Sequence, residues 1–64
     1  MDRIKLECEI KRAGYTLEAF ATEIGMNRTT FWRKLNGESE FTLGEIKAIS
    51  RLLMSDPTDI FFSE

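Results

Sequence analysis

Four neighbouring side chains combine positive charge, hydrogen-bonding groups and aromatic surface within two turns of a predicted helix: Arg28, Thr29, Trp32 and Arg33. Residues 26–37 hold three basic residues and no acidic residue. In the DNA major groove an arginine can bind guanine at two atoms, and a threonine can contact a thymine methyl group or a phosphate. These residue types on one outward helix face are therefore suited to contacts with duplex DNA.

The segment before this helix is predicted to form a short helix of its own. Thr16 is a favourable N-cap, and Glu18 lies in the first turn, where the helix dipole favours an acid. The apolar stripe of this helix consists of residues at helical spacing: Leu17, Phe20, Ala21 and Ile24.

The corner between the two helices needs a small side chain where the helix axes cross and a backbone that can turn sharply. Ala21 supplies the small side chain, and Gly25 permits the left-handed backbone of a tight turn. Asn27 can cap the following helix, which we expect to run from about Arg28 to Asn36. The pattern as a whole predicts a helix-turn-helix.

The second helix of this pair also needs an inner face. Met26 and Phe31 are expected to attach it to the core. Trp32, beside Phe31, either lies against the sugar-phosphate backbone of DNA or covers the contact between the helices, and the sequence favours neither. Asn36 and the backbone near Gly37 lie at the far end, where we expect a phosphate contact that sets register without reading sequence.

Residues 3–10 fit two patterns. Alternate positions are apolar, as in a half-buried strand: Ile4, Leu6, Cys8 and Ile10. Leu6, Ile10 and Ala13 also lie at helical spacing, and the helical remainder of the chain offers no partner strand. We therefore favour a helix over a strand here, and we expect Cys8 to be a buried thiol.

The C-terminal part is predicted to add one longer helix and a short last turn. Thr42 and Glu45 form a capping-box pattern. The helix that follows should turn its apolar residues inward: Leu43, Ile46, Ile49, Leu53 and Leu52. Asp56 before Pro57 is the pattern of another helix start. Three apolar residues close the chain and either cover the open end of the core or form a dimer contact: Ile60, Phe61 and Phe62.

Length and charge are consistent with this arrangement. The 64 residues suit one domain, residues 1–64, built as an all-α, compact bundle of four to five short helices. The net charge of −2 is uneven, because residues 26–37 carry +3 and residues 38–64 carry −4. Since phosphate contacts supply most non-specific affinity, we expect weak binding to random DNA and one local basic face.

Catalysis and cofactor binding have few candidate residues. The chain has no histidine, its single cysteine lacks a partner base, and its carboxylates are scattered, so we expect no enzyme, cofactor or metal site. No apolar run approaches the ~18 residues of a membrane span. Charged residues interrupt the N-terminus where a signal peptide would be apolar. We therefore expect a cytoplasmic protein without membrane contact.

Taken together, the motifs resemble the Cro/phage-repressor (Xre-like) helix-turn-helix family, and the resemblance extends from about Leu6 to Phe62. The matching residues are the following: Thr16, Glu18, Phe20-Ala21, Ile24-Gly25, Asn27-Arg28, Thr30-Phe31 and Asn36-Gly37. The chain is also similar to small prophage regulators of Gram-positive bacteria. The resemblance implies a lambda-repressor-like bundle that binds double-stranded operator DNA, usually as a symmetric dimer.

The resemblance also implies roles for single residues. Base edges would be contacted by Arg28, Thr29 and Arg33, with Trp32 as a further candidate, and phosphates by Thr16, Asn27 and Asn36. Two positions depart from the family pattern: Leu17 stands where a glutamine is frequent near the phosphates, and Lys34 stands where an apolar residue is common. We expect Leu35 to supply the packing while the ammonium group of Lys34 stays free for a phosphate.

Three functions remain open at this point. The first is a Cro-like repressor whose homodimer, formed at least on DNA, places two helices in major grooves about 34–36 Å apart on a pseudo-palindromic operator. The alternative is an antirepressor or modulator that binds a partner repressor, which the acidic C-terminal half and Leu17 favour. An antitoxin that binds both DNA and a toxin is the third.

Overall fold

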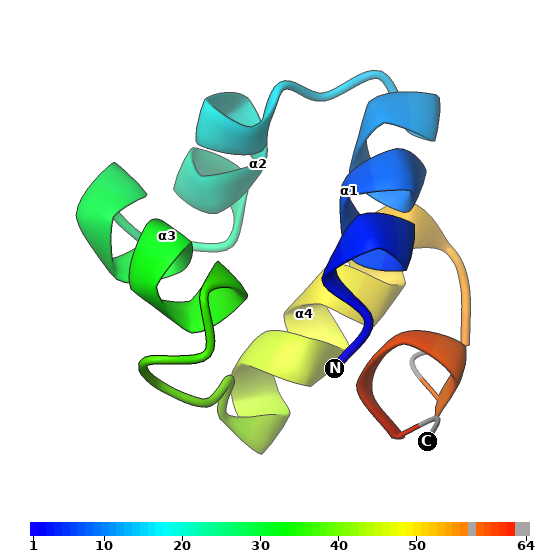
Figure 1. Cartoon of the computed structure of the whole chain (residues 1–64). Helices are drawn as coiled ribbons and strands as arrows, with labels where there is room; N and C mark the ends of the chain where they lie inside the picture. Colours follow the sequence, from blue (N-terminus) through cyan, green and yellow to red (C-terminus); the bar gives the residue numbers. More distant parts are fainter. Residues whose placement is uncertain (57, 63–64) are drawn as a thin grey trace.

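The computed structural model describes residues 1–56 and 58–62, and its helices form a bundle without strands in this part of the chain (Figure 1). In chain order the elements are α1 (Arg3–Arg12), α2 (Leu17–Glu23), α3 (Arg28–Leu35), α4 (Leu43–Leu53) and the short π-helix η1 (Thr58–Phe62). The predicted all-α bundle is confirmed, and residues 3–10 belong to a helix rather than a strand.

One face of α1 contributes to the core. Asp2 caps this helix by accepting a hydrogen bond from the backbone N–H of Lys5 at 3.0 Å. Leu6 and Ile10, four residues apart, are fully buried. Cys8 is exposed, so the expectation of a buried thiol is wrong. The physical reason is helix geometry: Cys8 is two positions from both buried residues, and a helix turns such a position to the opposite face.

A chain of aromatic rings runs through the centre of the bundle. Phe20 of α2 and Phe31 of α3 are both fully buried, with ring centroids 6.2 Å apart. The ring of Tyr15, just before α2, packs edge-on against Phe20 with the ring centroids 5.4 Å apart. Phe41 lies 6.0 Å from Phe31 and 5.5 Å from Phe61, which connects α3 to η1. These contacts pack α3 directly against α2 and the loop that holds Phe41, and Phe41 in turn contacts η1.

The predicted capping box at the start of α4 is confirmed. The Thr42 side chain accepts from the Glu45 backbone, and the Glu45 side chain accepts from the Thr42 backbone. Ile46 and Ile49 are buried as expected, and Leu52 and Leu53 pack partly against the core. Leu43 is 63% exposed, so its expected inward position is wrong. Leu43 is the first residue of α4, so its side chain lies at the end of the helix, before the turns that pack inward through Ile46 and Ile49.

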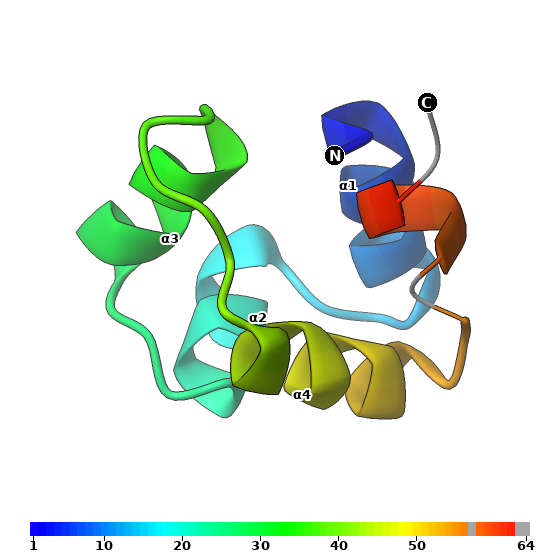
Figure 2. The ribbon, with the colours of Figure 1, turned by 90° about the horizontal axis from the view of Figure 1, so that it is seen from below.

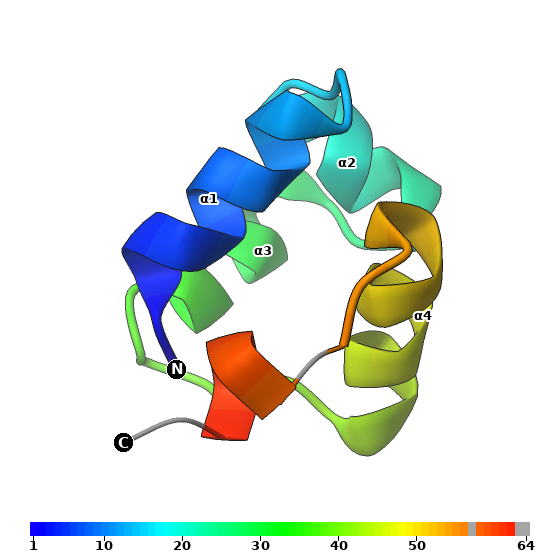
Figure 3. The same cartoon turned by 90° about the vertical axis from the view of Figure 1, so that its right-hand side faces the viewer.

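The C-terminal residues cover part of the core. The backbone N–H of Asp2 donates to the carbonyl of Ile60 at 2.7 Å, which places η1 beside the start of α1 (Figure 3). Ile60 is buried and Phe61 packs partly against the core, whereas Phe62 is 59% exposed. Ile60 and Phe61 therefore close the core, as one of the two alternatives proposed. Pro57 lies outside the described residues.

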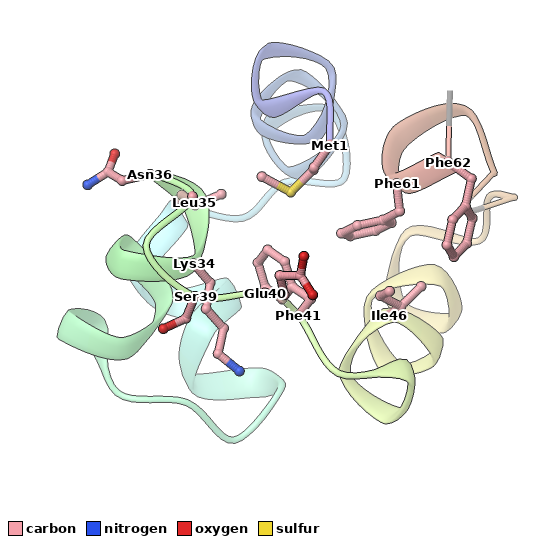
Figure 4. Close-up of a pocket in the computed structure, with 11 residues that line it drawn as sticks. Met1, Lys34, Leu35, Asn36, Ser39, Glu40, Phe41, Ile46, Phe61 and Phe62 are labelled. Carbon is pink, nitrogen blue, oxygen red and sulfur yellow. The ribbon is translucent and has the colours of Figure 1, made fainter. Parts of the chain in front are cut away.

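An open hollow lies between the end of α3, the start of α4 and η1 (Figure 4). Its lining includes apolar residues from these segments and from the loop before α4: Leu35, Phe41, Ile46, Phe61 and Phe62. α3 itself lies at the opposite side of the molecule from η1 (Figures 1 and 2). None of the helices in residues 1–56 and 58–62 combines the length and the hydrophobicity that a membrane span needs.

Candidate nucleic-acid interface

The corner between α2 and α3 has the predicted construction. Ala21 is 1% exposed, and its carbonyl accepts from the backbone N–H of Met26 at 2.9 Å. Gly25 has a φ of +79°, which a residue with a side chain rarely adopts. Met26 and Phe31, 8% and 0% exposed, anchor α3 to the core. The inner face of α3 is thereby fixed, and its outer face is left to solvent.

Both helices of the motif start at the predicted caps. The Thr16 hydroxyl oxygen accepts from the backbone N–H of Ala19 at 3.0 Å. Oδ1 of Asn27 accepts from the backbone N–H of Thr30 at 2.8 Å. Each cap uses an oxygen acceptor, so the hydroxyl hydrogen of Thr16 and the Nδ2 group of Asn27 are not consumed by these bonds. These two groups can still donate to a phosphate.

The outer face of α3 presents the predicted polar and charged side chains. Arg28, Thr29 and Arg33 are all exposed. A shallow hollow along this face is lined by these three residues and by Trp32, Asn36 and Glu38. The structure thus brings the four candidate base-contacting residues onto one surface. Whether they contact bases stays a prediction.

Trp32 combines features of both alternatives considered for it. It is half-buried and packs against the core, with its ring 6.1 Å from the Phe31 ring in an edge-on arrangement. It also lines the outer hollow beside Arg28, whose Cζ atom lies 5.5 Å from the Trp32 ring centroid. Trp32 therefore supports the arginine on the outer face while it covers part of the core.

An acid from α2 also reaches this face. Nη1 of Arg28 lies 3.7 Å from Oε2 of Glu18, and both side chains are 69% exposed. The segment 26–37 contains no acid of its own, so sequence position alone did not reveal this pair. The sequence singled out Glu18 as a residue of the first helical turn and as part of the family pattern, but the Glu18–Arg28 contact depends on how α2 and α3 pack.

Lys34 does not have the free ammonium group that we expected. Its side chain is only 12% exposed, and Nζ lies 2.5 Å from Oε1 of Glu45. Nζ also lies 5.9 Å from the centroid of the Phe41 ring. The expectation is therefore wrong, because α4 places a carboxylate where the lysine can pair within the fold. Leu35, 3% exposed, supplies the packing at the end of α3, as predicted.

Asn36 follows the end of α3 and is exposed, as a phosphate contact requires. Asn36 is one of the residues that line the hollow of Figure 4, where its side chain extends away from Phe41 and Phe61. Oδ1 of Asn36 accepts a hydrogen bond from Nη1 of Arg3, and Nε of Arg3 donates to Glu7 at 2.7 Å. Arg3 was not a candidate from sequence, since it is 33 positions away from Asn36. The fold thus places the guanidinium group of Arg3 near the C-terminal end of α3, in addition to those of Arg28 and Arg33 on the helix itself.

Similarity to known proteins was found at the level of a family. A family model described as a Cro/C1-type HTH DNA-binding domain matches residues 5–62, which is nearly the whole chain. Neither the curated proteins nor the solved structures contain a significant match to this sequence. The matched range includes α2, α3 and the turn between them.

Proposed function

The chain belongs to the Cro/C1-type helix-turn-helix family of DNA-binding domains, and we propose that it is a sequence-specific repressor of the Cro-like type. The observation that carries this proposal is the division of α3 into two faces. Phe31 and Leu35 hold the inner face in the core, while Arg28, Thr29 and Arg33 are exposed on the outer face. Such a helix can enter the major groove without rearrangement of the bundle.

Roles for single residues follow from their positions on this surface. Arg28 and Arg33 would bind base edges, Thr29 would contact a base or a phosphate, and Trp32, beside Arg28, is the further candidate for a base contact. The remaining phosphate contacts are assigned to three residues near the helix ends: Thr16, Asn27 and Asn36. Lys34 is left out of this set because its ammonium group is paired with Glu45.

The repressor would act by occupying its site. A homodimer would place two copies of α3 in successive major grooves about 34–36 Å apart and so block polymerase or a rival repressor in the cytoplasm. Because the chain has a net charge of −2, selectivity should depend on base contacts more than on general attraction to phosphate.

Arg33→Ala tests this assignment against a matched change of charge, Arg51→Ala, on the exposed surface of α4. The duplex is first identified by selection from a random pool with the wild-type protein. Loss of a bidentate base contact is expected to weaken binding by about five- to 150-fold, which corresponds to about 1–3 kcal/mol. Arg51→Ala should change affinity by less than about twofold.

Two results would contradict the proposal. If Arg33→Ala binds with wild-type affinity and selectivity, and circular dichroism shows an intact fold, Arg33 does not contact bases as assigned. If the wild-type protein enriches no sequence from the random duplex pool, the proposed regulator function is contradicted. A palindromic consensus, together with a dimer by analytical ultracentrifugation of the complex, would support the dimeric repressor.

A second candidate function is a modulator that binds a partner repressor. It is favoured by Phe62, which is 59% exposed and lines the hollow of Figure 4 together with Phe61. Tight binding to a partner repressor, combined with no retardation of a random duplex pool at low salt, would favour this function over the first.

A further inference from the structure

Glu18 of α2 lies beside Arg28 on the surface assigned to DNA. Its negative charge is repelled by the phosphates of DNA. We propose that Glu18 is a positioning residue that holds Arg28 for base recognition and thereby increases specificity. This inference rests on the proposed function, because it concerns how Arg28 distinguishes one duplex from another.

The guanidinium group of Arg28 is held from two directions. Oε2 of Glu18 lies 3.7 Å from Nη1 of Arg28, and the Trp32 ring centroid lies 5.5 Å from Cζ of Arg28. Trp32 is one helical turn further along α3 and is itself packed against the core. An ion pair from α2 and a cation–π contact from α3 therefore restrict the same side chain before any ligand binds.

Arg33 provides an internal contrast on the same helix. It is exposed, and within residues 1–56 and 58–62 it makes no ion pair. The two arginines of the outer face thus differ: Arg28 is restrained by an acid, and Arg33 is not. A specificity effect of Glu18 should accordingly concern the base read by Arg28 and leave the base read by Arg33 unchanged.

The carboxylate has opposite consequences for the two kinds of DNA contact. A phosphate near Arg28 would be repelled by Glu18, and Arg28 would merely exchange one anion for another. A guanine edge is uncharged and offers two acceptors, so a guanidinium group already restrained can bind it with less loss of side-chain freedom. Glu18 should therefore weaken binding to random duplexes more than binding to the preferred site.

Glu18→Gln is the test, and Glu23→Gln is the matched control. Both substitutions remove one negative charge from the exposed surface of α2, but Glu23 makes no ion pair among the described residues. The base position that depends on Arg28 is found as the one whose preference is lost in Arg28→Ala. At this position, Glu18→Gln is expected to lower the preference over other bases by about two- to fivefold. Glu23→Gln should leave the preference unchanged.

A second measurement does not depend on DNA. The ¹⁵Nε–¹Hε resonance of Arg28 in the free protein should shift in Glu18→Gln and remain in place in Glu23→Gln. An unchanged resonance in Glu18→Gln, or an equal effect of both variants on specific and random duplexes, would overturn the positioning role. If the wild-type protein selects no sequence at all, the proposed function is contradicted. This result differs from an equal effect of Glu18→Gln and Glu23→Gln on DNA binding, which contradicts only the positioning role.

Discussion

Lys34 and Glu45 connect α3 to α4 through one short contact, with 2.5 Å between Nζ and Oε1. The same Glu45 oxygen accepts from the backbone N–H of Thr42 at 2.8 Å and so completes the capping box of α4. One carboxylate therefore stabilises the start of α4 and fixes the end of α3. This double role explains why Lys34 is directed into the fold rather than toward the surface assigned to DNA.

The first prediction concerns the pH dependence of this pair. Burial raises the pKa of Glu45, but hydrogen bonds from Lys34 and from the backbone of Thr42 outweigh burial, and the pKa lies below its ordinary value of 4.5. A carboxyl whose pKa is lower in the folded state stabilises the fold when it is charged. This contribution is present above pH 4.5 and is lost as the pH falls through the lower folded-state pKa.

Glu45→Gln removes the charge and keeps an oxygen for the capping box. We expect a decrease in the free energy of unfolding of about 1 kcal/mol at pH 7, measured with urea. At pH 3 the difference from the wild-type protein should be smaller, because pH 3 lies below the ordinary pKa of 4.5, where protonation of this carboxyl stabilises the unfolded state. Glu40→Gln, at an exposed position, is the control. An equal difference at both pH values would show that the pair does not provide the stability.

A second prediction concerns the approach of the two helices at Ala21, which is 1% exposed. Ala21→Leu inserts three carbon atoms where α2 and α3 meet, so we expect the free energy of unfolding to fall by about 1–3 kcal/mol. Ala19→Leu places the same side chain on the exposed face of α2 and should change stability little. Thermal unfolding followed by circular dichroism compares the two. Equal midpoints would indicate that the corner tolerates bulk.

The features that could be predicted from sequence are those determined by neighbouring residues. The caps at Thr16, Asn27 and Thr42 each bond to a backbone N–H three positions later, so a short motif is sufficient to identify them. The left-handed backbone at Gly25 likewise follows from the type of one residue. The helix starts and the corner of the motif could therefore be predicted from neighbouring residues alone.

Contacts between elements could not be predicted in this way. Arg28 pairs with Glu18 of α2, Lys34 pairs with Glu45 of α4, and Arg3 donates to Asn36 across 33 positions. Each pair depends on the distance and rotation between two packed helices, which no short sequence motif encodes. The sequence therefore overestimated the positive charge that residues 26–37 present to solvent. In the fold, α2 and α4 bring acids to Arg28 and Lys34.

The last prediction separates two roles of Asn27, which caps α3 through Oδ1 and is assigned a phosphate contact through Nδ2. Asn27→Ala removes both groups, so the free energy of unfolding should fall by about 1 kcal/mol, and DNA affinity should fall as well. Asn27→Asp keeps a capping oxygen and adds a negative charge at the start of α3, which the helix dipole favours. We expect the stability of this variant to equal or exceed that of the wild-type protein. Its DNA affinity should nevertheless fall, because the new charge would face a phosphate. Urea unfolding and fluorescence anisotropy on the selected duplex measure the two quantities, and retained affinity in Asn27→Asp would place the phosphate elsewhere.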